Sequence, residues 1–478
     1  MKTKKITIEP VTRVEGHGKV TILLDEQGQV SQARLHIVEF RGFERFIQGR
    51  PYWEVPVLVQ RLCGICPVSH HLAAAKAMDI IVGADRLTPT AEKVRRLMHY
   101  GQTFQSHALH FFHLVSPDLL FGFGADVAVR NVLGVAAKYP ELAVQGVMMR
   151  KYGQEIIKAT AGKKIHGTGA IPGGVNKNLS VEERDGFLRE IDQMLAWCRS
   201  ALKLAQEYTL AHLDVLADFG AFDSNHVSLV RADGAMDLYH GNLRAINAVG
   251  EKIFDQVDYQ SYFKYIAEEV KPWSYMKFPF ISSLGPETGW YRVGPLARVN
   301  ACDCIDTPEA EAARKAFKAL TGGKPNNITM AYHWARMIEL LHAGEKIREL
   351  LNDPDLQGND LVVTGKRREE AVGLIEAPRG TLFHHYETDE RGLIKMANMV
   401  VATGNNAARI AMSVDRAAKG VIKGGNVTEG LLNKVEMAFR AYDPCLGCAT
   451  HTLPGHMPLI AKIYDHRRQL VQELVQNG

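Results

Sequence analysis

Two C-x-x-C pairs, one near each end of the chain, most constrain how this sequence can fold. The first is Cys63 and Cys66 in RLCGICPVSHH, and the second is Cys445 and Cys448 in DPCLGCATH. Only 7 cysteines occur in 478 residues. That is too few for a disulfide framework, so the paired thiols indicate metal or redox chemistry. If the four sulfurs hold one centre, folding must bring the two ends of the chain together.

Charge and hydropathy exclude several other classes of protein. Lys and Arg number 57 against 53 Asp and Glu, with no long run of like charge, so nothing indicates binding to nucleic acid. No apolar stretch is long enough for a membrane span or a secretory signal. We therefore expect a cytoplasmic protein with one large domain or two to three smaller ones.

Hydrophobic periodicity predicts a helix-dominated α+β fold. Apolar and polar residues alternate in 19–25 and 32–40, which predicts an antiparallel hairpin within about 1–45. The mixed composition of about 219–279, with aromatic and glycine residues, predicts a smaller lobe of short strands. The expected helices cover residues 67–83, 88–115, 180–213, 331–353 and 426–442. Cys66 would lie at the first helix N-terminus, where unpaired N–H groups favour a thiolate.

The spacing of the thiols leaves the metal open. A closed tetrahedral site of four cysteines typically holds structural zinc. Iron–sulfur ligation uses the same four thiolates. Neither can be chosen from C-x-x-C spacing alone.

The text around the pairs resembles the large, catalytic subunit of nickel–iron hydrogenases. Five motifs carry the resemblance in order: VTRVEGHGK, FRGFERFIQGRP, RLCGIC, EAPRGTLFHHY and DPCLGCATH. Their wording is most similar to the cytoplasmic NAD-reducing bidirectional hydrogenases. The resemblance implies reversible oxidation of hydrogen to protons and electrons. It also implies a single catalytic domain over residues 1–451, with a long-helix core and peripheral antiparallel β segments.

The resemblance also assigns roles around the thiols. It implies that Cys63, Cys66, Cys445 and Cys448 hold nickel, and that Cys66 and Cys448 bridge to an iron with two cyanides and one carbon monoxide. By the same resemblance, hydrogen would be split heterolytically, with Cys445 as the base and Glu15 as the proton relay. His70, one helical turn after Cys66, would hydrogen-bond a bridging sulfur.

Two further groups follow from the same resemblance. Arg379 would lie over the metals beside Pro378, which lines the iron's ligands, and Asp118 and Asp443 would orient its guanidinium. Glu44 and His451 would hold a magnesium ion with a backbone carbonyl from ATGNNAAR, residues 402–409.

The implied partners are diaphorase subunits that bind FMN and NAD, together with an iron–sulfur small subunit. Acceptors such as NADP or a deazaflavin remain open, because the chain has no glycine-rich dinucleotide loop. Two other classes also remain: a structural zinc protein, and the related subunit of respiratory complex I, which lacks the nickel cysteines.

The tail is expected to be a processing signal. By resemblance, nickel chaperones load the site and a maturation endopeptidase then removes residues 452–478 after His451. The alternative is an ordinary amphipathic C-terminal helix.

Overall fold

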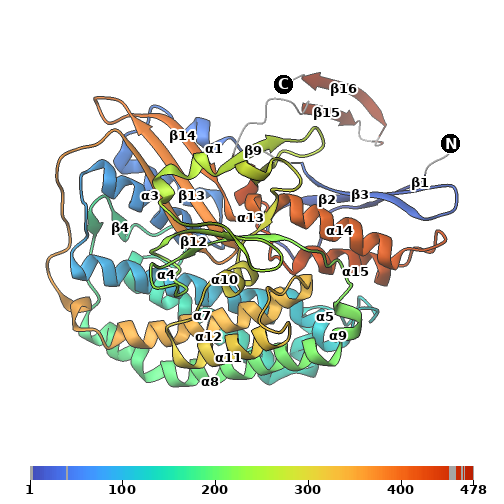
Figure 1. Cartoon of the computed structure of the whole chain (residues 1–478), viewed down its shortest axis with the longest axis horizontal. Helices are drawn as coiled ribbons and strands as arrows, with labels where there is room; N and C mark the ends of the chain where they lie inside the picture. The colour runs from blue at the N-terminus through green and yellow to red at the C-terminus, as the bar shows by residue number, and fades with distance from the viewer. Residues whose placement is uncertain (1–3, 39–40, 452–458, 465–466, 468, 477–478) are drawn as a thin grey trace.

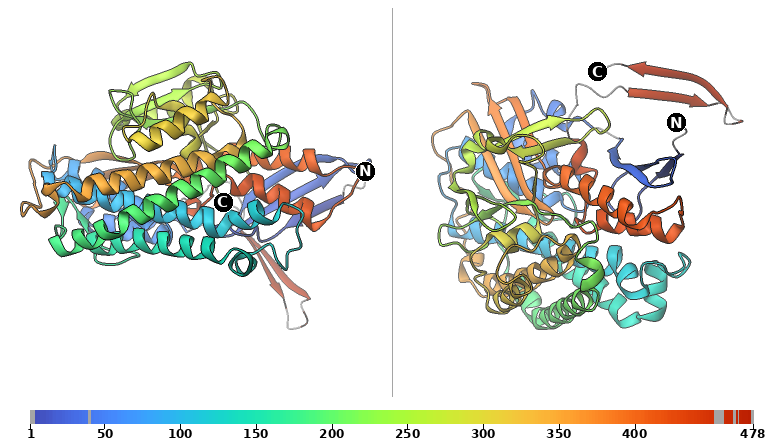
Figure 2. Two further views of the ribbon diagram at one scale, coloured as in Figure 1. Left: turned by 90° about the horizontal axis from the view of Figure 1, so that it is seen from below. Right: turned by 45° about the vertical axis from the view of Figure 1, so that its right-hand side comes forward.

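The computed structural model describes residues 4–38, 41–451, 459–464, 467 and 469–476. One side of the molecule is a layer of four long helices (Figure 1): α4 (Pro89–Leu109), α7 (Pro140–Ala161), α8 (Val181–Ala211) and α12 (Tyr332–Leu351). α4 packs against α7 and α12, and α12 packs against α8. The view from below shows these helices running side by side along the molecule (Figure 2).

Three of the four long helices, α4, α8 and α12, begin and end close to where the sequence predicts, whereas α7 was not predicted. Ser180 Oγ accepts from the Glu183 N–H and the Glu183 carboxylate accepts from the Ser180 N–H, which is the capping box expected at the start of α8. The segment predicted at 88–115 is helical throughout, but it widens after α4 into a π-helical turn, His110–Val115. α5 (Ser116–Phe121) follows directly.

The lobe at about 219–279 contains short strands, as expected. A four-stranded sheet has the order β11-β6-β7-β8, and a separate pair joins β9 and β10. Their bounds are β6 (Asn225–Val230), β7 (Asn242–Ile246), β8 (Lys252–Val257), β9 (Ile266–Val270), β10 (Lys277–Ile281) and β11 (Tyr291–Arg292). Only the β11–β6 pair is parallel among these.

α3 (Pro67–Ile81) packs on an antiparallel sheet of β12 (Glu370–Ala377), β13 (Gly380–Thr388) and β14 (Ile394–Val400). Pro378 and Arg379 form the tight connection between β12 and β13. This sheet, which was not predicted from the sequence, is not peripheral, because both α3 and β6 of the lobe contact it. Its strands are buried over most of their length.

The N-terminal sheet brings the two ends of the chain together. β2 (Gly18–Leu24) and β3 (Val30–Ile37) form the predicted antiparallel hairpin, and β1 (Lys4–Ile8) adds a third strand that was not predicted. α14 (Ala407–Val421) packs on β3, and α15 (Glu429–Arg440) packs on α14. After α15 the chain returns along the loop before β2, where the Leu446 N–H donates to the Glu15 carbonyl at 2.9 Å.

The remaining elements are short: α1 (Phe43–Phe46), α2 (Val55–Leu58), α6 (Val132–Lys138), α9 (Leu213–Leu216), α10 (Pro295–Ala301), α11 (Pro308–Ala319), α13 (Ala402–Asn405), β4 (Ala170–Ile171) and β5 (Gly174–Val175). The largest apolar core joins the long helices to β2, β3 and α14. A second core joins α3 to the sheet β12–β13–β14. Over the ranges that the structure describes, no helix is long and apolar enough to cross a bilayer.

The tail contains strands rather than the alternative amphipathic helix. β15 (Leu459–Tyr464) and β16 (Leu470–Gln476) pair antiparallel and stand away from the body of the chain in every view (Figures 1 and 2). The helix alternative is therefore wrong, because residues 459–464 and 470–476 satisfy each other's backbone groups across a hairpin. The expected cleavage after His451 adjoins residues 452–458, which lie outside the described residues.

Gly373 in β12 tests how closely α3 and the sheet approach. A Cβ at this position would overlap the Ala73 carbonyl and lie 2.7 Å from the Ala77 nitrogen. Gly373→Ala should therefore lower the free energy of unfolding by about 1–3 kcal/mol, seen as a lower thermal midpoint of the purified protein. Gly420→Ala, on the exposed end of α14 with open space around it, is the matched control. It should be neutral or stabilising by up to about 1 kcal/mol. Equal loss in both variants would contradict close packing.

Candidate metal centre

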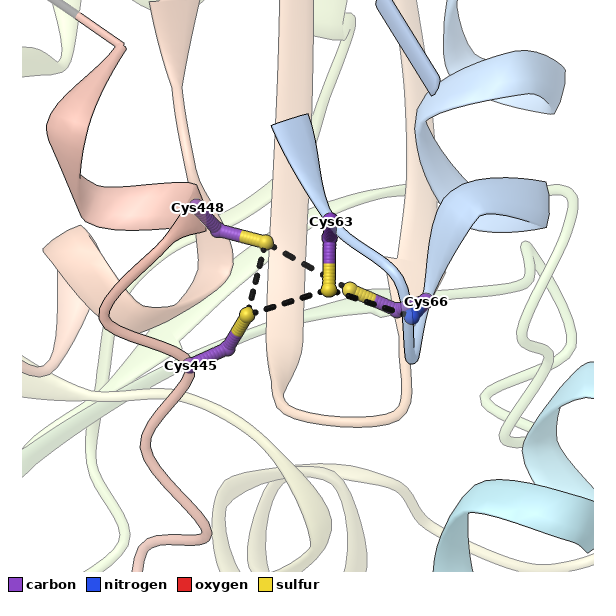
Figure 3. A group of neighbouring side chains, drawn as sticks. All are labelled: Cys63, Cys66, Cys445 and Cys448. Carbon is purple, nitrogen blue, oxygen red and sulfur yellow. Dashed lines mark hydrogen bonds between the residues drawn. The ribbon is translucent and has the colours of Figure 1, made fainter. Parts of the chain in front are cut away.

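The four cysteines of the two pairs meet at one buried point (Figure 3). Their sulfurs all lie within 4.8 Å of one another. Cys63 Sγ is 3.2 Å from Cys445 Sγ, and Cys448 Sγ is 3.5 Å from Cys66 Sγ and 2.9 Å from Cys445 Sγ. Within the described ranges, no other cluster of three or more Cys, His, Asp or Glu side chains has this geometry. Four soft donors at this spacing fit a thiolate-bound metal centre.

The first pair gains backbone hydrogen bonds from the start of α3. Cys63 Sγ accepts from the N–H groups of Ile65 and Cys66, each at 3.2 Å. Cys66 is the N-cap of α3 and Pro67 fills its first position, as predicted. Unpaired N–H groups at this helix end stabilise negative charge on sulfur.

The thiols share their protons unequally. Burial raises the pKa of Cys445 and Cys448 well above the usual range. Burial also opposes ionisation of Cys63, but hydrogen bonds from Cys445 and Cys448 outweigh it and hold the pKa of Cys63 well below the usual range. Full deprotonation of the cluster therefore needs a bound metal.

Arg41 ties the two cysteine segments together, and sequence analysis missed it. Its guanidinium donates to the Leu62 carbonyl at 2.5 Å, to the Thr450 hydroxyl at 2.9 Å and to the Gly447 carbonyl. Leu62 precedes Cys63, and Gly447 lies between the second pair of cysteines. Most of its partners are backbone groups, so no pattern of side chains in the sequence could have indicated this role.

Glu15 lies beside Cys445, as expected. Its Oε2 accepts from the Gly447 N–H at 2.7 Å and is 3.0 Å from Cys445 Sγ. The backbones of Glu15 and Cys445 also form a short parallel bridge. This carboxylate is half-buried, so it connects the buried sulfur with the outer part of the molecule.

Arg379 projects from the β12–β13 connection toward the second pair of cysteines. It donates from Nε to the Asp443 carbonyl at 2.6 Å, from Nη2 to Asp443 Oδ1 at 3.0 Å and from Nη1 to Ser106 Oγ at 3.4 Å. Burial opposes ionisation of Asp443, but the Arg379 guanidinium outweighs it and holds the pKa of Asp443 well below its usual value. The predicted pairing of Arg379 with Asp443 is therefore present.

The prediction that Asp118 also orients Arg379 is wrong. Asp118 Oδ1 accepts from Arg13 at 2.7 Å and Oδ2 accepts from Arg440 at 2.5 Å. The reason is local: α4 presents Ser106 to Arg379, whereas Asp118 lies in α5, beyond the π-helical turn. Asp118 instead holds the loop that carries Glu15.

His70 contacts one of the two sulfurs that the resemblance assigns as bridging. Its Nε2 lies 3.2 Å from Cys448 Sγ, on the opposite cysteine segment, rather than on Cys66 one turn earlier. Burial lowers the pKa of His70 to about 4. A neutral imidazole therefore faces the sulfur.

Pro378 lines a small cavity next to the sulfurs. The cavity wall consists of Cys66, Ser69, His70, Ala377, Pro378, Arg379, Leu382, Ala402, Thr403, Cys445 and Cys448. Apart from Arg379, His70 and the two hydroxyls, this wall is apolar or sulfur, which suits small uncharged or diatomic groups next to a metal.

Glu44 and His451 lie close together at a second candidate metal site, separate from the four thiols. Glu44 Oε1 is 3.6 Å from His451 Nε2 and accepts from the Met399 N–H at 2.8 Å. Burial lowers the pKa of His451 to about 4, with the nearby Lys277 acting in the same direction. A backbone group of Met399 in β14 hydrogen-bonds His451 here, while the carbonyl expected from residues 402–409 stays a prediction. A carboxylate, a carbonyl and an imidazole fit a hard cation that keeps several waters.

Comparison with known proteins fixes the family. The nickel-dependent hydrogenase family matches residues 41–125 and 239–451, and a HoxL-like family matches residues 5–40. The chain belongs to the nickel-dependent hydrogenase family. It is 48% identical to the beta subunit of the NAD-reducing hydrogenase HoxS of Cupriavidus necator, covering 98% of this chain and 99% of that protein. It is 41% identical to one subunit of the F420-non-reducing hydrogenase of Methanothermobacter thermautotrophicus, over 98% of this chain and 100% of that one.

Solved structures agree with this hydrogenase fold. An NAD+-reducing [NiFe]-hydrogenase in the H2-reduced state superimposes with a TM-score of 0.92 at 55% identity, covering 94% of this chain and 99% of that one. A Ni-Fe-Se hydrogenase from D. vulgaris Hildenborough shares the fold with a TM-score of 0.76 at 23% identity. The chain is thus the catalytic subunit of a hydrogenase, and the predicted α+β class is confirmed. The two alternative classes, a structural zinc protein and the related complex I subunit, therefore do not account for the four cysteines.

Cys66→Ser tests the cluster directly. Replacing one of four soft donors by a hydroxyl should remove most bound nickel and iron, measured by elemental analysis of the purified enzyme. Cys198→Ser is the control, because Cys198 is also fully buried but lies in α8 with its sulfur near the Leu340 carbonyl. It should keep the wild-type metal content. Retention of both metals in Cys66→Ser would exclude Cys66 as a ligand.

Proposed function

We propose that this hydrogenase catalyses the reversible oxidation of hydrogen and that its electrons pass to NAD. The observation that carries the proposal is the near full-length similarity to a protein named as an NAD-reducing hydrogenase, together with the thiol cluster. Relatives named as F420-non-reducing hydrogenases match over similar lengths. An acceptor other than NAD, such as NADP, is therefore the second candidate.

The residues at the cluster fit a nickel–iron centre. Cys63, Cys66, Cys445 and Cys448 would hold nickel, with Cys66 and Cys448 also bound to iron. The centre, when bound, supplies heterolytic cleavage of hydrogen and storage of its electrons. Cyanide and carbon monoxide on the iron would occupy the cavity next to Pro378, where Arg379 and the hydroxyls of Ser69 and Thr403 can donate to them.

Cys445 and Glu15 would form the start of the proton path. The Cys445 sulfur takes the proton released from hydrogen, and Glu15 Oε2, 3.0 Å away, accepts it next. The Gly447 N–H fixes this carboxylate in place at 2.7 Å. A positioned carboxyl group can take up and release a proton in each turnover, which is general acid–base work.

Arg379 would hold a permanent positive charge over the centre. Asp443 and Ser106 fix its guanidinium from the other side, so it cannot turn to solvent. We retain Asp443 and His70 as positioning groups of the site. Asp118 acts at a distance, through Arg13, on the Glu15 loop.

Glu44, His451 and the carbonyl expected from residues 402–409 would hold magnesium. His451 is the last residue before the proposed cleavage, and its Nδ1 is 3.1 Å from the Cys448 carbonyl. A cation here would fix the new C-terminus next to the thiol cluster.

Electrons must leave through another protein chain. Apart from this cluster, the described residues contain no set of sulfur ligands for an iron–sulfur centre. We therefore propose that the direct partner is an iron–sulfur small subunit, with a diaphorase that carries FMN and binds NAD in the cytoplasm. Nickel chaperones and a maturation endopeptidase would act before assembly.

The function is tested on the purified native complex. Hydrogen-dependent reduction of NAD should be seen by absorbance, with nickel and iron each near one per chain beyond the iron–sulfur complement. Infrared bands of metal-bound carbon monoxide and cyanide should accompany them. Zinc without such bands would overturn the proposal, and reduction of NADP alone would favour the second candidate. The intact mass of the purified chain should equal that of a chain whose last residue is His451.

Glu15→Gln tests the proton path. Glutamine still accepts from the Gly447 N–H but cannot take up a proton, so hydrogen oxidation should fall by about 100-fold or more with nickel content unchanged. Glu26→Gln makes the same charge change in an exposed turn and should leave the rate unaltered. A fall of less than about 2-fold in Glu15→Gln would place the proton exit elsewhere.

A further inference from the structure

Three buried aromatic side chains form a line from the Cys448 sulfur into the central sheet. His70 Nε2 is 3.2 Å from Cys448 Sγ, and His70 Nδ1 is 3.1 Å from His384 Nε2. His384 Nδ1 is 2.6 Å from the Tyr386 hydroxyl. His384 and Tyr386 lie two residues apart on β13 and therefore share one face of the sheet. Exposure of the three side chains is 1% or less, so bulk water does not compete for these contacts.

The sulfur end fixes where each proton lies. A thiolate that binds a metal carries no proton, so His70 must donate to it from Nε2. A neutral imidazole has one N–H, and His70 Nδ1 is then an acceptor. His384 must consequently donate from Nε2 and accept at Nδ1. That leaves the Tyr386 hydroxyl as the donor at the far end of the line.

We propose that His384 and Tyr386 are positioning residues that keep the N–H of His70 directed at Cys448, and so maintain one hydrogen bond on a sulfur of the metal centre. This inference rests on the function proposed above, because it requires a metal-bound thiolate at Cys448. Through this line, two residues of β13 influence the electron density on the Cys448 sulfur, because they maintain the hydrogen bond that it accepts from His70.

The packing explains why one arrangement is held. α3, which carries His70, packs on β12 and β13, so the two imidazoles cannot separate. If His384 changed tautomer, its bare Nε2 would face the bare Nδ1 of His70 at 3.1 Å. Leaving such buried groups unpaired is costly. The Tyr386 hydroxyl disfavours this change, since it donates a hydrogen bond to His384 Nδ1 at 2.6 Å.

Tyr386→Phe removes only this last donor, and infrared spectroscopy of the purified complex reports the result. Loss of a hydrogen bond on the sulfur raises electron density at the metals, so the carbon monoxide band should shift to lower wavenumber. Tyr152→Phe is the control: Tyr152 is also buried, but its hydroxyl donates to the Phe187 carbonyl at 3.1 Å, in the helix layer. Its band should not move, and both variants should keep their nickel and iron.

Two variants at His384 give an independent test. Gln can donate an amide N–H toward His70 Nδ1 without Tyr386, whereas Met cannot. His384→Gln should therefore keep the wild-type band, and His384→Met should shift it in the same direction as Tyr386→Phe. This pair decides the question if Tyr386→Phe fails to assemble.

The results that would overturn this inference differ from those that would overturn the proposed function. An unmoved band in metal-loaded Tyr386→Phe, or equal bands in His384→Gln and His384→Met, would overturn the inference. A wild-type complex without carbon monoxide bands would instead overturn the proposed function, before any variant is compared.

Discussion

The meeting of four thiols from opposite ends of the chain is the constraint on which the rest of this structure depends. Their sulfurs approach to 2.9–3.5 Å in a site closed to solvent. Four thiolates there would repel one another strongly without a cation, so full deprotonation of the site requires a bound metal. Arg41 and the backbone bridge between Glu15 and Cys445 hold the two segments together by hydrogen bonds that need no metal. The two ends of the chain are therefore joined by hydrogen bonds in addition to any bound metal.

Different elements of the fold supply the polar side chains around the thiol cluster. The loop before β2 brings Glu15 to Cys445, and α3 brings His70 to Cys448. The β12–β13 connection brings Arg379 over the same cysteines, where Asp443 and Ser106 hold it. A base, a hydrogen-bond donor and a fixed cation thus reach the site from separate, rigid elements. Such preorganised groups need no rearrangement when charge develops during a reaction.

A buried ion network supports the proton side from behind. Asp118 joins Arg13, two residues before Glu15, to Arg440 at the end of α15. The network thereby connects the N-terminal loop to the helix that precedes the second cysteine pair. Arg13 has a left-handed backbone, φ 56°, which a non-glycine residue adopts only when its surroundings hold it there. We attribute the fixed position of Glu15 to these contacts as well as to its own bond with Gly447.

The sequence by itself determined the thiol set, helix α3, the capped helix α8 and the N-terminal hairpin, because short spacings and helical periods are local properties. The roles expected of Glu15 and Arg379 came from the resemblance of their motifs to the hydrogenase family. Tertiary structure alone decided the partners of those groups. It gave His70 to Cys448, gave Asp118 to Arg13 instead of Arg379, and placed the sheet β12–β13–β14 inside the molecule. Contacts of this kind join residues hundreds of positions apart, and no local pattern encodes them. Arg41 shows the limit most clearly, since two of the carbonyls that it binds belong to Leu62 and Gly447, one from each cysteine segment.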